Sequence, residues 1–292
     1  MLLRDADAAM YKAKERGRGR YEVFDFTMRD QAMARQQTRN ALHRALPERQ
    51  LVVHYQPIVR LSDHATVGVE ALVRWDHPEW GLLPAQRFIP IAEKSGLIEA
   101  VSEFVLCQAC QDLARWERNP LSNVDIVAIN LSALQLNQPT LISQIDSMLK
   151  QTGADPSKLC FEITESAVMS DIDRAMLMLK GLRNLGVRIA VDDFGTGYSS
   201  LASLRKLPLD ILKVDREFTR GLATSSEDRA IAHTIITLAH RLGLTAIAEG
   251  VEIQAQVAEL VALDCDLVQG YFFGEPVAAS QLQWERHPIS LA

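Results

Sequence analysis

The stretch KLCFEITESAVMSDIDRAMLMLKGLRNLGVRIAVDDF, residues 158–194, decides the fold class. It begins with an apolar, β-rich run, continues with a segment whose apolar residues recur at helical spacing, and ends in a second apolar run. The helical segment stops at Gly186, because glycine commonly terminates helices. A strand, a helix and a strand in this order predict parallel pairing and an α/β fold. The second run closes with Asp192 and Asp193, although neighbouring side chains on a strand point to opposite faces.

Apolar, β-rich runs of this kind recur eight times along the chain. They are LVVHYQPIV, TVGVEALVRW, DIVAINLS, KLCFEITES, VRIAVDDF, DILKVDREF, LTAIAEGVE and CDLVQGYFF. From the third run onward helical patterns separate them, so the sequence predicts a TIM-like (β/α)8 barrel. Only RLSDHA separates the first two runs, which is too short for a parallel crossover, so we expect a hairpin and an antiparallel first strand. The stretch from Asp76 to Asn123 is expected to hold two helices.

The composition is that of an ordinary globular protein. Of its 292 residues, 48% are hydrophobic and 23% are charged. No apolar stretch reaches the roughly 18 residues of a membrane span, and the charged N-terminus does not resemble a signal peptide. We therefore expect a cytoplasmic chain without a membrane segment. The net charge of −6 argues against binding to nucleic-acid polymers. The CxxC spacing of Cys107 and Cys110 lies in a helical pattern without a second ligand pair, so we expect reduced thiols.

Polar residues stand at the predicted carboxyl ends of seven strands. They are Glu70 and Arg74, Asn130, Glu162 and Glu165, Asp192 and Asp193, Lys213 and Asp215, Glu249 and Glu252, and Gln269. Any one of these acids alone is readily explained as a solvated loop residue or a helix cap. In a barrel, however, these strand ends meet at one mouth, and so many acids would repel one another unless a cation neutralised them. Oxygen-rich clusters suit Mg²⁺ or Mn²⁺, and adjacent acids can serve two neighbouring ions.

Other catalytic classes lack their sequence marks. None of the seven histidines forms an HxH or HExxH pair, which argues against a zinc hydrolase. No GxSxG elbow is present, which argues against a serine hydrolase. Gly195 and Gly197 fit either a phosphate-binding loop or a loop that packs beside the metal site.

Several motifs together resemble the EAL-domain family. They are YQPIV, VEALVRWDHPEWG, FIPIAEKSGLI, INLSALQL, FEITES, VDDFGTGYSSLASLRKLPLDILKVD, AEGVE and QGYFFGEP, and they occur in order from about Arg39 to Leu282. The resemblance implies a phosphodiesterase that hydrolyses the bacterial second messenger cyclic di-GMP to linear pGpG with two Mg²⁺ or Mn²⁺ ions and is inhibited by Ca²⁺. The alternative within this family is a cyclic di-GMP receptor with little turnover, but the chain departs from the family pattern at none of the site positions.

The resemblance also implies a role for each site residue. The metal ligands would be Glu70, Asn130, Glu162, Asp192, Asp193 and Glu249, of which Glu70 and Glu249 also count as catalytic. Lys213 would orient the attacking water or steady charge on the phosphate. The substrate contacts would be Gln56, Leu72, Arg74, Asp215, Glu252 and Gln269. Glu165 resembles the family glutamate that pins the DDFGTGYS loop, although its sequence context also fits a structural capping role.

The resemblance further implies a domain organisation. Residues 1–25 resemble the last helix and strand of a GGDEF (diguanylate cyclase) domain without its GGDEF motif, residues 26–46 would form a helical linker, and residues 47–285 would form the EAL barrel. The chain would then be a fragment of a longer GGDEF–EAL protein, in which upstream sensor or membrane segments are compatible with this sequence. Family members often dimerise near the loop after Glu165 and the helix that follows it, so we expect a homodimer.

Overall fold

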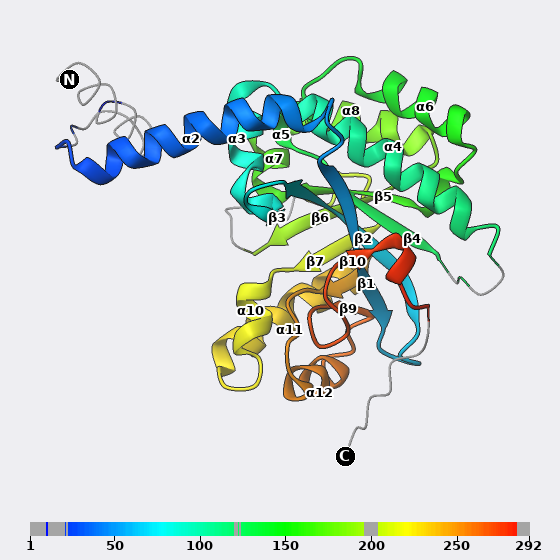
Figure 1. Ribbon diagram of the computed structural model, residues 1–292. Coiled ribbons are helices and arrows are strands. Elements are labelled where there is room, and N and C mark those ends of the chain that lie inside the picture. The colour runs from blue at the N-terminus through cyan, green and yellow to red at the C-terminus, as the bar shows by residue number, and fades with distance from the viewer. Residues whose placement is uncertain are drawn as a thin grey trace. The chain divides into compact units, whose positions relative to one another are not determined.

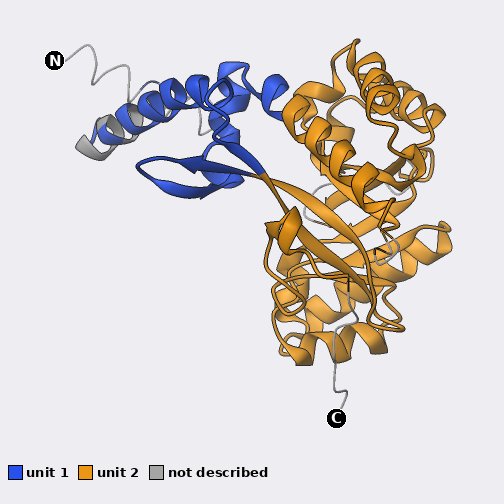
Figure 2. Ribbon diagram, turned by 45° about the vertical axis from the view of Figure 1, so that its right-hand side comes forward, with its two compact units in different colours: residues 1–52, 74–101 blue, residues 53–73, 102–292 orange. Residues whose placement is uncertain are grey.

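The computed structural model describes residues 10, 21, 23–119, 122, 124–195 and 204–284. The chain divides into two compact units, residues 1–52 with 74–101 and residues 53–73 with 102–292 (Figure 2). The predicted GGDEF segment, residues 1–25, falls almost wholly outside the described residues, so this part of the domain prediction stays a prediction.

Eight strands close a barrel (Figure 1). In chain order they are β1 (Leu51–Arg60), β2 (Thr66–His77), β4 (Ile126–Asn130), β5 (Leu159–Thr164), β6 (Arg188–Phe194), β7 (Ile211–Val214), β8 (Thr245–Ala248) and β9 (Leu267–Gln269). The neighbours run β1-β9-β8-β7-β6-β5-β4-β2, and β1 also pairs with β2, which completes the ring. The predicted barrel is therefore confirmed.

The first strand differs from the others as the short RLSDHA connection predicts. β1 pairs antiparallel with β9, with Ile58 opposite Gln269. The other barrel strands, in the order β2, β4, β5, β6, β7, β8 and β9, each pair parallel with the next. Two short strands absent from the prediction extend the sheet: β3 (Gly81–Pro84) pairs with β2, and β10 (Val277–Ala278) pairs with β1.

The helices follow the predicted alternation. The longer ones are α2 (Phe26–Ala45), α3 (Ile89–Ser95), α4 (Ile98–Trp116), α6 (Leu141–Thr152), α8 (Ile172–Asn184), α11 (Ser226–Arg241) and α12 (Gln254–Ala262). The two helices expected between Asp76 and Asn123 are α3 and α4. Short single-turn 3-10 segments also occur, η1 (Ala85–Arg87), η2 (Pro156–Lys158) and η3 (Ala279–Gln281). Cys107, Cys110, Cys160 and Cys265 form no disulfide in the structure.

Three short helices begin just after strands and shape the mouth of the barrel. They are α5 (Ala133–Leu136), α7 (Glu165–Ser170) and α10 (Arg216–Gly221). Each begins with a side-chain cap, from Ser132, Thr164 and Asp215 respectively, whose oxygen accepts a bond from a backbone N–H of the first turn. These caps turn the chain sharply at the carboxyl ends of β4, β5 and β7.

Apolar side chains fill the opposite end of the barrel. Buried residues from all eight strands form one cluster, namely Ile58, Val67, Ile126, Ala128, Cys160, Ala190, Ile211, Ile247 and Leu267. Most of them come from the first residues of their strands, so the amino-terminal end is a packed core rather than a pore. The carboxyl ends are left to carry polar groups. Within the described part of the chain, no helix has the length and apolar character needed to cross a membrane.

Candidate active site

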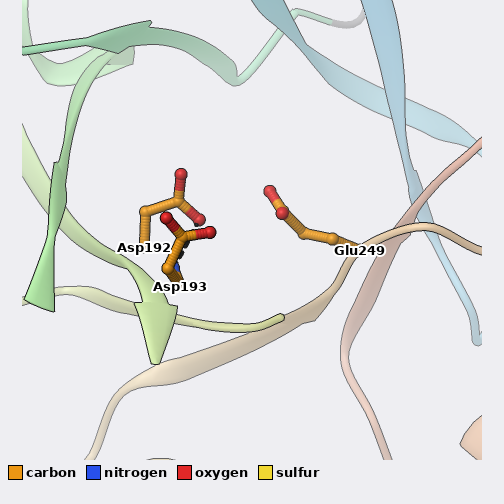
Figure 3. Close-up of side chains that lie close together, drawn as sticks. All are labelled: Asp192, Asp193 and Glu249. Carbon is orange, nitrogen blue, oxygen red and sulfur yellow. Dashed lines mark hydrogen bonds between the residues drawn. The ribbon is translucent and has the colours of Figure 1, made fainter. Parts of the chain in front are cut away.

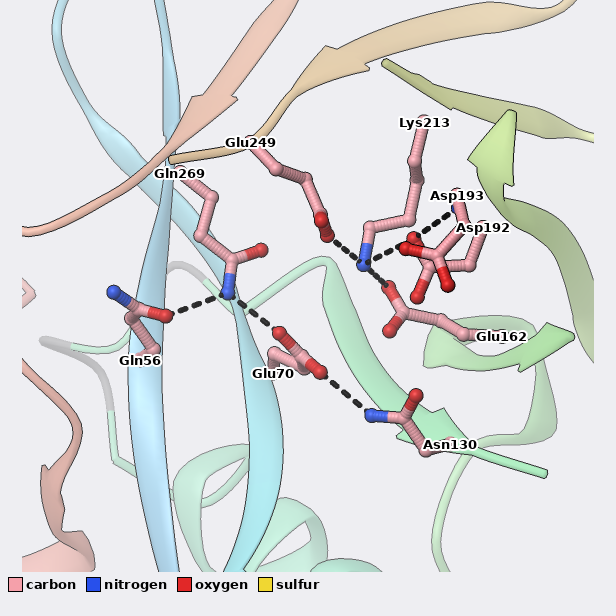
Figure 4. A network of polar contacts seen from close by, with 9 residues as sticks. All are labelled: Gln56, Glu70, Asn130, Glu162, Asp192, Asp193, Lys213, Glu249 and Gln269. Carbon is pink, nitrogen blue, oxygen red and sulfur yellow. Dashed lines mark hydrogen bonds and ion pairs between the residues drawn. The ribbon is translucent and has the colours of Figure 1, made fainter. Parts of the chain in front are cut away.

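The strand ends bring the predicted polar residues together in the barrel unit. Figure 4 shows nine of them around one mouth, namely Gln56, Glu70, Asn130, Glu162, Asp192, Asp193, Lys213, Glu249 and Gln269. They come from β1, β2, β4, β5, β6, β7 and β9, and from the residue directly after β8. The structure therefore assembles most of the predicted site.

Lys213 lies at the centre of the acidic part of the mouth. Its side chain has no exposed surface, and its Nζ lies 2.6 Å from Glu162 Oε1 and 3.6 Å from Asp192 Oδ1 and also contacts Glu249. Burial alone would lower the pKa of Lys213, but the surrounding carboxylates outweigh this effect and raise it well above its ordinary value. Lys213 is therefore a fixed positive charge that the three acids share.

The carboxylates around Lys213 are crowded. Burial raises the pKa of Glu162 well above its ordinary value, and the neighbouring acids raise it further against the effect of Lys213. Burial likewise raises the pKa of Glu249 to about 8, assisted by Asp192 and Glu70. In addition, Glu162 Oε2 is buried without a hydrogen-bond partner. One ammonium group thus does not satisfy the negative charge of this cluster.

A backbone irregularity explains why two adjacent aspartates face the same site. The pairing of β6 with β7 shifts register between Val191 and Phe194, and Asp193 adopts a left-handed conformation with φ 54°. This bulge turns the Asp193 side chain toward the face that Asp192 occupies, and the Asp193 N–H donates to Asp192 Oδ1 at 2.9 Å. One oxygen each from Asp192, Asp193 and Glu249 lie within 4.8 Å of one another (Figure 3).

Asp193 holds its proton more tightly than an ordinary aspartate. Its pKa is raised to about 6 by partial burial, by Asp192 and by Asp215, against a smaller opposite effect of Lys213. A divalent cation among the oxygens of Asp192, Asp193 and Glu249 would relieve this repulsion.

Glu70 has different partners from the other buried acids. Asn130 Nδ2 donates to Glu70 Oε1 and Gln269 Nε2 donates to Glu70 Oε2, both at 2.6 Å. Gln269 Nε2 also donates to Gln56 Oε1 at 3.0 Å. The family resemblance implies that Gln56 and Gln269 are substrate contacts. In the structure, hydrogen bonds link both residues to Glu70, a predicted metal ligand.

Glu165 lies beside the site rather than in the acidic cluster. Its side chain is buried, and its Oε2 accepts a hydrogen bond of 3.0 Å from the Gly195 N–H. This contact ties Glu165 to the first residue after β6, and the loop-pinning role that the family resemblance implies for Glu165 stays a prediction. The rest of that loop, including Gly197, lies outside the described residues.

Of the remaining predicted residues, Asp215 is linked to the cluster through a side-chain hydrogen bond with Asp193. Asp215 is buried and caps α10 through a 2.6 Å bond from the Glu217 N–H. Leu72 is half-buried on β2, whereas Glu252 is exposed. Arg74 belongs to the unit formed by residues 1–52 and 74–101, where it pairs with Pro84 in the β2–β3 hairpin. The substrate contacts proposed for these residues stay predictions.

Two glycines outside the predicted site, Gly250 and Gly270, position the turn that carries Glu249. A Cβ on Gly270 would lie 2.1 Å from the Val251 carbonyl oxygen, and a Cβ on Gly250 would lie 2.5 Å from Arg216 Cβ. Gly250 also has φ 68°, which favours glycine. In the sequence, each of these glycines directly follows a polar site residue, in AEGVE and in QGYFF. A glycine at such a position can indicate that another part of the chain approaches too closely for any side chain.

The donor set fits hard divalent cations. The groups facing the mouth are carboxylate and amide oxygens, and the described residues there contribute neither histidine nor cysteine. Such oxygen ligands are the ones that Mg²⁺ and Mn²⁺ prefer. The partnerless oxygen of Glu162 and the raised pKa values of the acids point to the same conclusion, since each indicates uncompensated negative charge.

Comparison with known proteins gives this arrangement a family. The family model of the EAL domain matches residues 39–276. The chain belongs to the EAL-domain family. It is 44% identical over 281 residues to the bifunctional diguanylate cyclase/cyclic di-GMP phosphodiesterase MucR of Pseudomonas aeruginosa, a match that covers 96% of this chain and 41% of MucR.

Other relatives agree with this assignment of the EAL domain. The cyclic di-GMP phosphodiesterase NbdA of the same organism is 42% identical over 282 residues, covering 97% of this chain and 36% of NbdA. The solved structure of the PaMucR phosphodiesterase in complex with c-di-GMP superimposes with a TM-score of 0.82 at 43% identity, covering 85% of this chain and all of that chain. The chain thus spans roughly two fifths of the length of these curated relatives.

Proposed function

We propose that this EAL domain is a metal-dependent phosphodiesterase that hydrolyses cyclic di-GMP to linear pGpG. The observation that carries the proposal is the complete cluster of oxygen ligands around Lys213, found in a barrel that resembles the PaMucR phosphodiesterase bound to c-di-GMP. The reaction adds water across one phosphodiester bond, so that one phosphate becomes a 5′ monoester and one 3′ hydroxyl is freed.

Two divalent cations, Mg²⁺ or Mn²⁺, would supply activation of the attacking water and stabilisation of the charge that develops at phosphorus. We assign Glu70, Asn130, Glu162 and Asp192 to one ion and Asp193 to the second, with Glu249 holding a ligand position or a water. Ca²⁺ is expected to inhibit, because it prefers more ligands at longer distances than Mg²⁺. The charge balance supports this assignment, since an acidic mouth without cations would repel a doubly anionic substrate.

The residues of the chain perform the remaining steps. Lys213 holds Glu162, Asp192 and Glu249 in place, and it offers a positive charge near the attacked phosphate. Glu249 can accept a proton from the attacking water when it is ionised, and its pKa of about 8 makes it a stronger base than an ordinary glutamate. We assign Gln56, Leu72, Arg74, Asp215, Glu252 and Gln269 to substrate recognition, and Glu165 to anchoring the loop after Asp193.

The test is nucleotide chromatography after incubation of the protein with cyclic di-GMP and Mg²⁺ or Mn²⁺, beside Glu70→Ala. Formation of pGpG by the wild type but not by the variant is the expected result. If the wild type binds cyclic di-GMP without converting it, the chain acts as a receptor instead and the proposal fails.

We also propose that the domain forms a homodimer and acts in the cytoplasm. The support for a dimer is Leu177 on α8, whose side chain is 73% exposed on the helix that follows the Glu165 turn. A second copy covering this residue would remove its apolar surface from water. Sedimentation should show a dimer that Leu177→Asp shifts to monomer, and a monomer at every wild-type concentration would contradict the dimer.

The N-terminal residues support a further assignment. We infer that residues 1–25 are the end of a GGDEF domain and that residues 26–46 are a helical linker before the EAL barrel of residues 47–285. The support is the bifunctional cyclase and phosphodiesterase MucR, which matches 96% of this chain. A GGDEF domain directly before this stretch in the same polypeptide would agree with this assignment, and a different domain there would contradict it.

A further inference from the structure

Two neutral amides hold the two oxygens of Glu70, and this sets Glu70 apart from the acids around Lys213. Asn130 holds Oε1 and Gln269 holds Oε2, each at 2.6 Å (Figure 4). Glu162 and Glu249 instead contact the Lys213 ammonium. A neutral donor fixes the direction of a carboxylate without cancelling its charge. The two hydrogen bonds thus fix the direction of both Glu70 oxygens without supplying an opposite charge.

A chain of hydrogen bonds fixes the orientation of the Gln269 amide. Gln56 Nε2 donates to the Gly274 carbonyl oxygen at 3.1 Å, so Gln56 Oε1 is left as the acceptor on the other side of that amide. Gln269 must then present its NH₂ group, which donates to both Gln56 and Glu70. An NH₂ group has two hydrogens, and both are used.

The same orientation leaves the carbonyl oxygen of Gln269 without a partner. Gln269 is 3% exposed, and its Oε1 is buried with no hydrogen bond. In Figure 4 this oxygen points away from Gln56, on the side of the amide that faces Glu249. A buried acceptor without a donor costs free energy, so its orientation is maintained by the bonds of the NH₂ group.

We propose that Gln269 is a positioning residue for the cation site, which holds Glu70 Oε2 in place while Gln56, anchored on Gly274, fixes the orientation of the Gln269 amide. The inference rests on the proposed function, because the cation site is the one that the phosphodiesterase would use. It gives Gln56 and Gln269 a role in metal binding that does not depend on contact with the nucleotide.

The experiment measures Mn²⁺ binding by titration calorimetry in the absence of nucleotide, with the full chain. Gln269→Met keeps the length of the side chain but removes both its donor and its acceptor, and Gln56→Met removes only the outer link. Loss of a residue that holds a metal ligand typically weakens metal binding about 10–100-fold. We expect a loss in this range for Gln269→Met and a smaller loss for Gln56→Met.

A control separates positioning from general destabilisation. Ile145→Val trims a fully buried side chain on α6, away from the strand ends that form the mouth. Thermal unfolding in chelator ranks the stability of all the variants, and Ile145→Val is expected to lower stability while binding Mn²⁺ with wild-type affinity.

The outcomes are distinguishable. Wild-type Mn²⁺ affinity in Gln269→Met overturns the inference and leaves the proposed phosphodiesterase intact. Absence of Mn²⁺ binding by the wild type overturns both. If Gln269→Met does not fold, Gln56→Met decides, because unchanged Mn²⁺ affinity in that variant shows that the chain from Gly274 does not act on the cation site.

Discussion

Replacing Lys213 with methionine is expected to destabilise the metal-free protein strongly. The Lys213 side chain is fully buried, and its ammonium lies against Glu162, Asp192 and Glu249. Removing one partner of a buried ion pair costs about 3–5 kcal/mol, because the remaining charge has neither water nor an opposite charge nearby. We expect the free energy of unfolding to fall by about this amount at pH 8.

The loss should be smaller in acid. The pKa of Glu249 is about 8 in the folded protein, above its ordinary value of 4.5, even with Lys213 beside it. A carboxyl group with a raised folded-state pKa stabilises the fold fully below its unfolded pKa, and this contribution is lost as the pH rises through the folded pKa. At pH 5.5 the acids left by Lys213→Met can take up protons, and their repulsion is then reduced.

Urea denaturation in chelator at pH 5.5 and pH 8 measures both effects. The matched control is Lys150→Met, which removes an exposed lysine paired with Asp146 on α6. Such surface pairs are worth about 0–1 kcal/mol, so the control should lose little stability at either pH. A loss for Lys213→Met no larger than that of the control would show that Lys213 does not balance the buried acids. An equal loss at the two pH values would show that these acids do not take up protons in its absence.

Three further predictions concern the same mouth. At pH 7, Mn²⁺ binding is expected to release protons, because Glu249 with a pKa of about 8 is largely protonated without metal. Calorimetry in buffers of different ionisation enthalpy should then give different heats of binding, and identical heats would count against proton release. Asp193→Gly is expected to be up to about 1 kcal/mol more stable than Asp193→Ala in chelator, because glycine adopts φ 54° without strain and alanine does not. Urea denaturation of the two variants compares them, and equal unfolding midpoints would disprove the strain. Glu165→Ala is expected to lower kcat with little change in Mn²⁺ affinity, because it frees the Gly195 N–H at the start of the loop but leaves the acidic cluster intact. Steady-state kinetics and calorimetry measure the two quantities, and a loss of both kcat and Mn²⁺ affinity would show that Glu165 instead supports the cation ligands.

The barrel could be predicted because its local signals agree. Alternating strands and helices with glycine at helix ends gave the eight-stranded ring, and the short RLSDHA stretch between the first two apolar runs gave the antiparallel first strand. The short helices α5, α7 and α10 were not predicted, since each is too brief for helical periodicity to appear. Strand β3 was missed for the same reason, because four residues carry little alternation.

The site could be predicted in its members but not in its contacts. The acids at the strand ends marked the mouth, yet strict alternation along a strand would have separated Asp192 from Asp193. The bulge that brings them together depends on pairing with β7, which a single sequence does not display. In the same way, the bonds that join Gln56, Gln269 and Glu70 link residues 213 and 199 positions apart.

The metal dependence of the reaction is best measured as pGpG formation by chelated protein while Mn²⁺ is returned stepwise. We expect no conversion of cyclic di-GMP in chelator and recovery of activity as Mn²⁺ fills the oxygen cluster. Turnover that persists undiminished in excess chelator would contradict it, because the acidic mouth would then process an anionic substrate without the cations on which the mechanism depends.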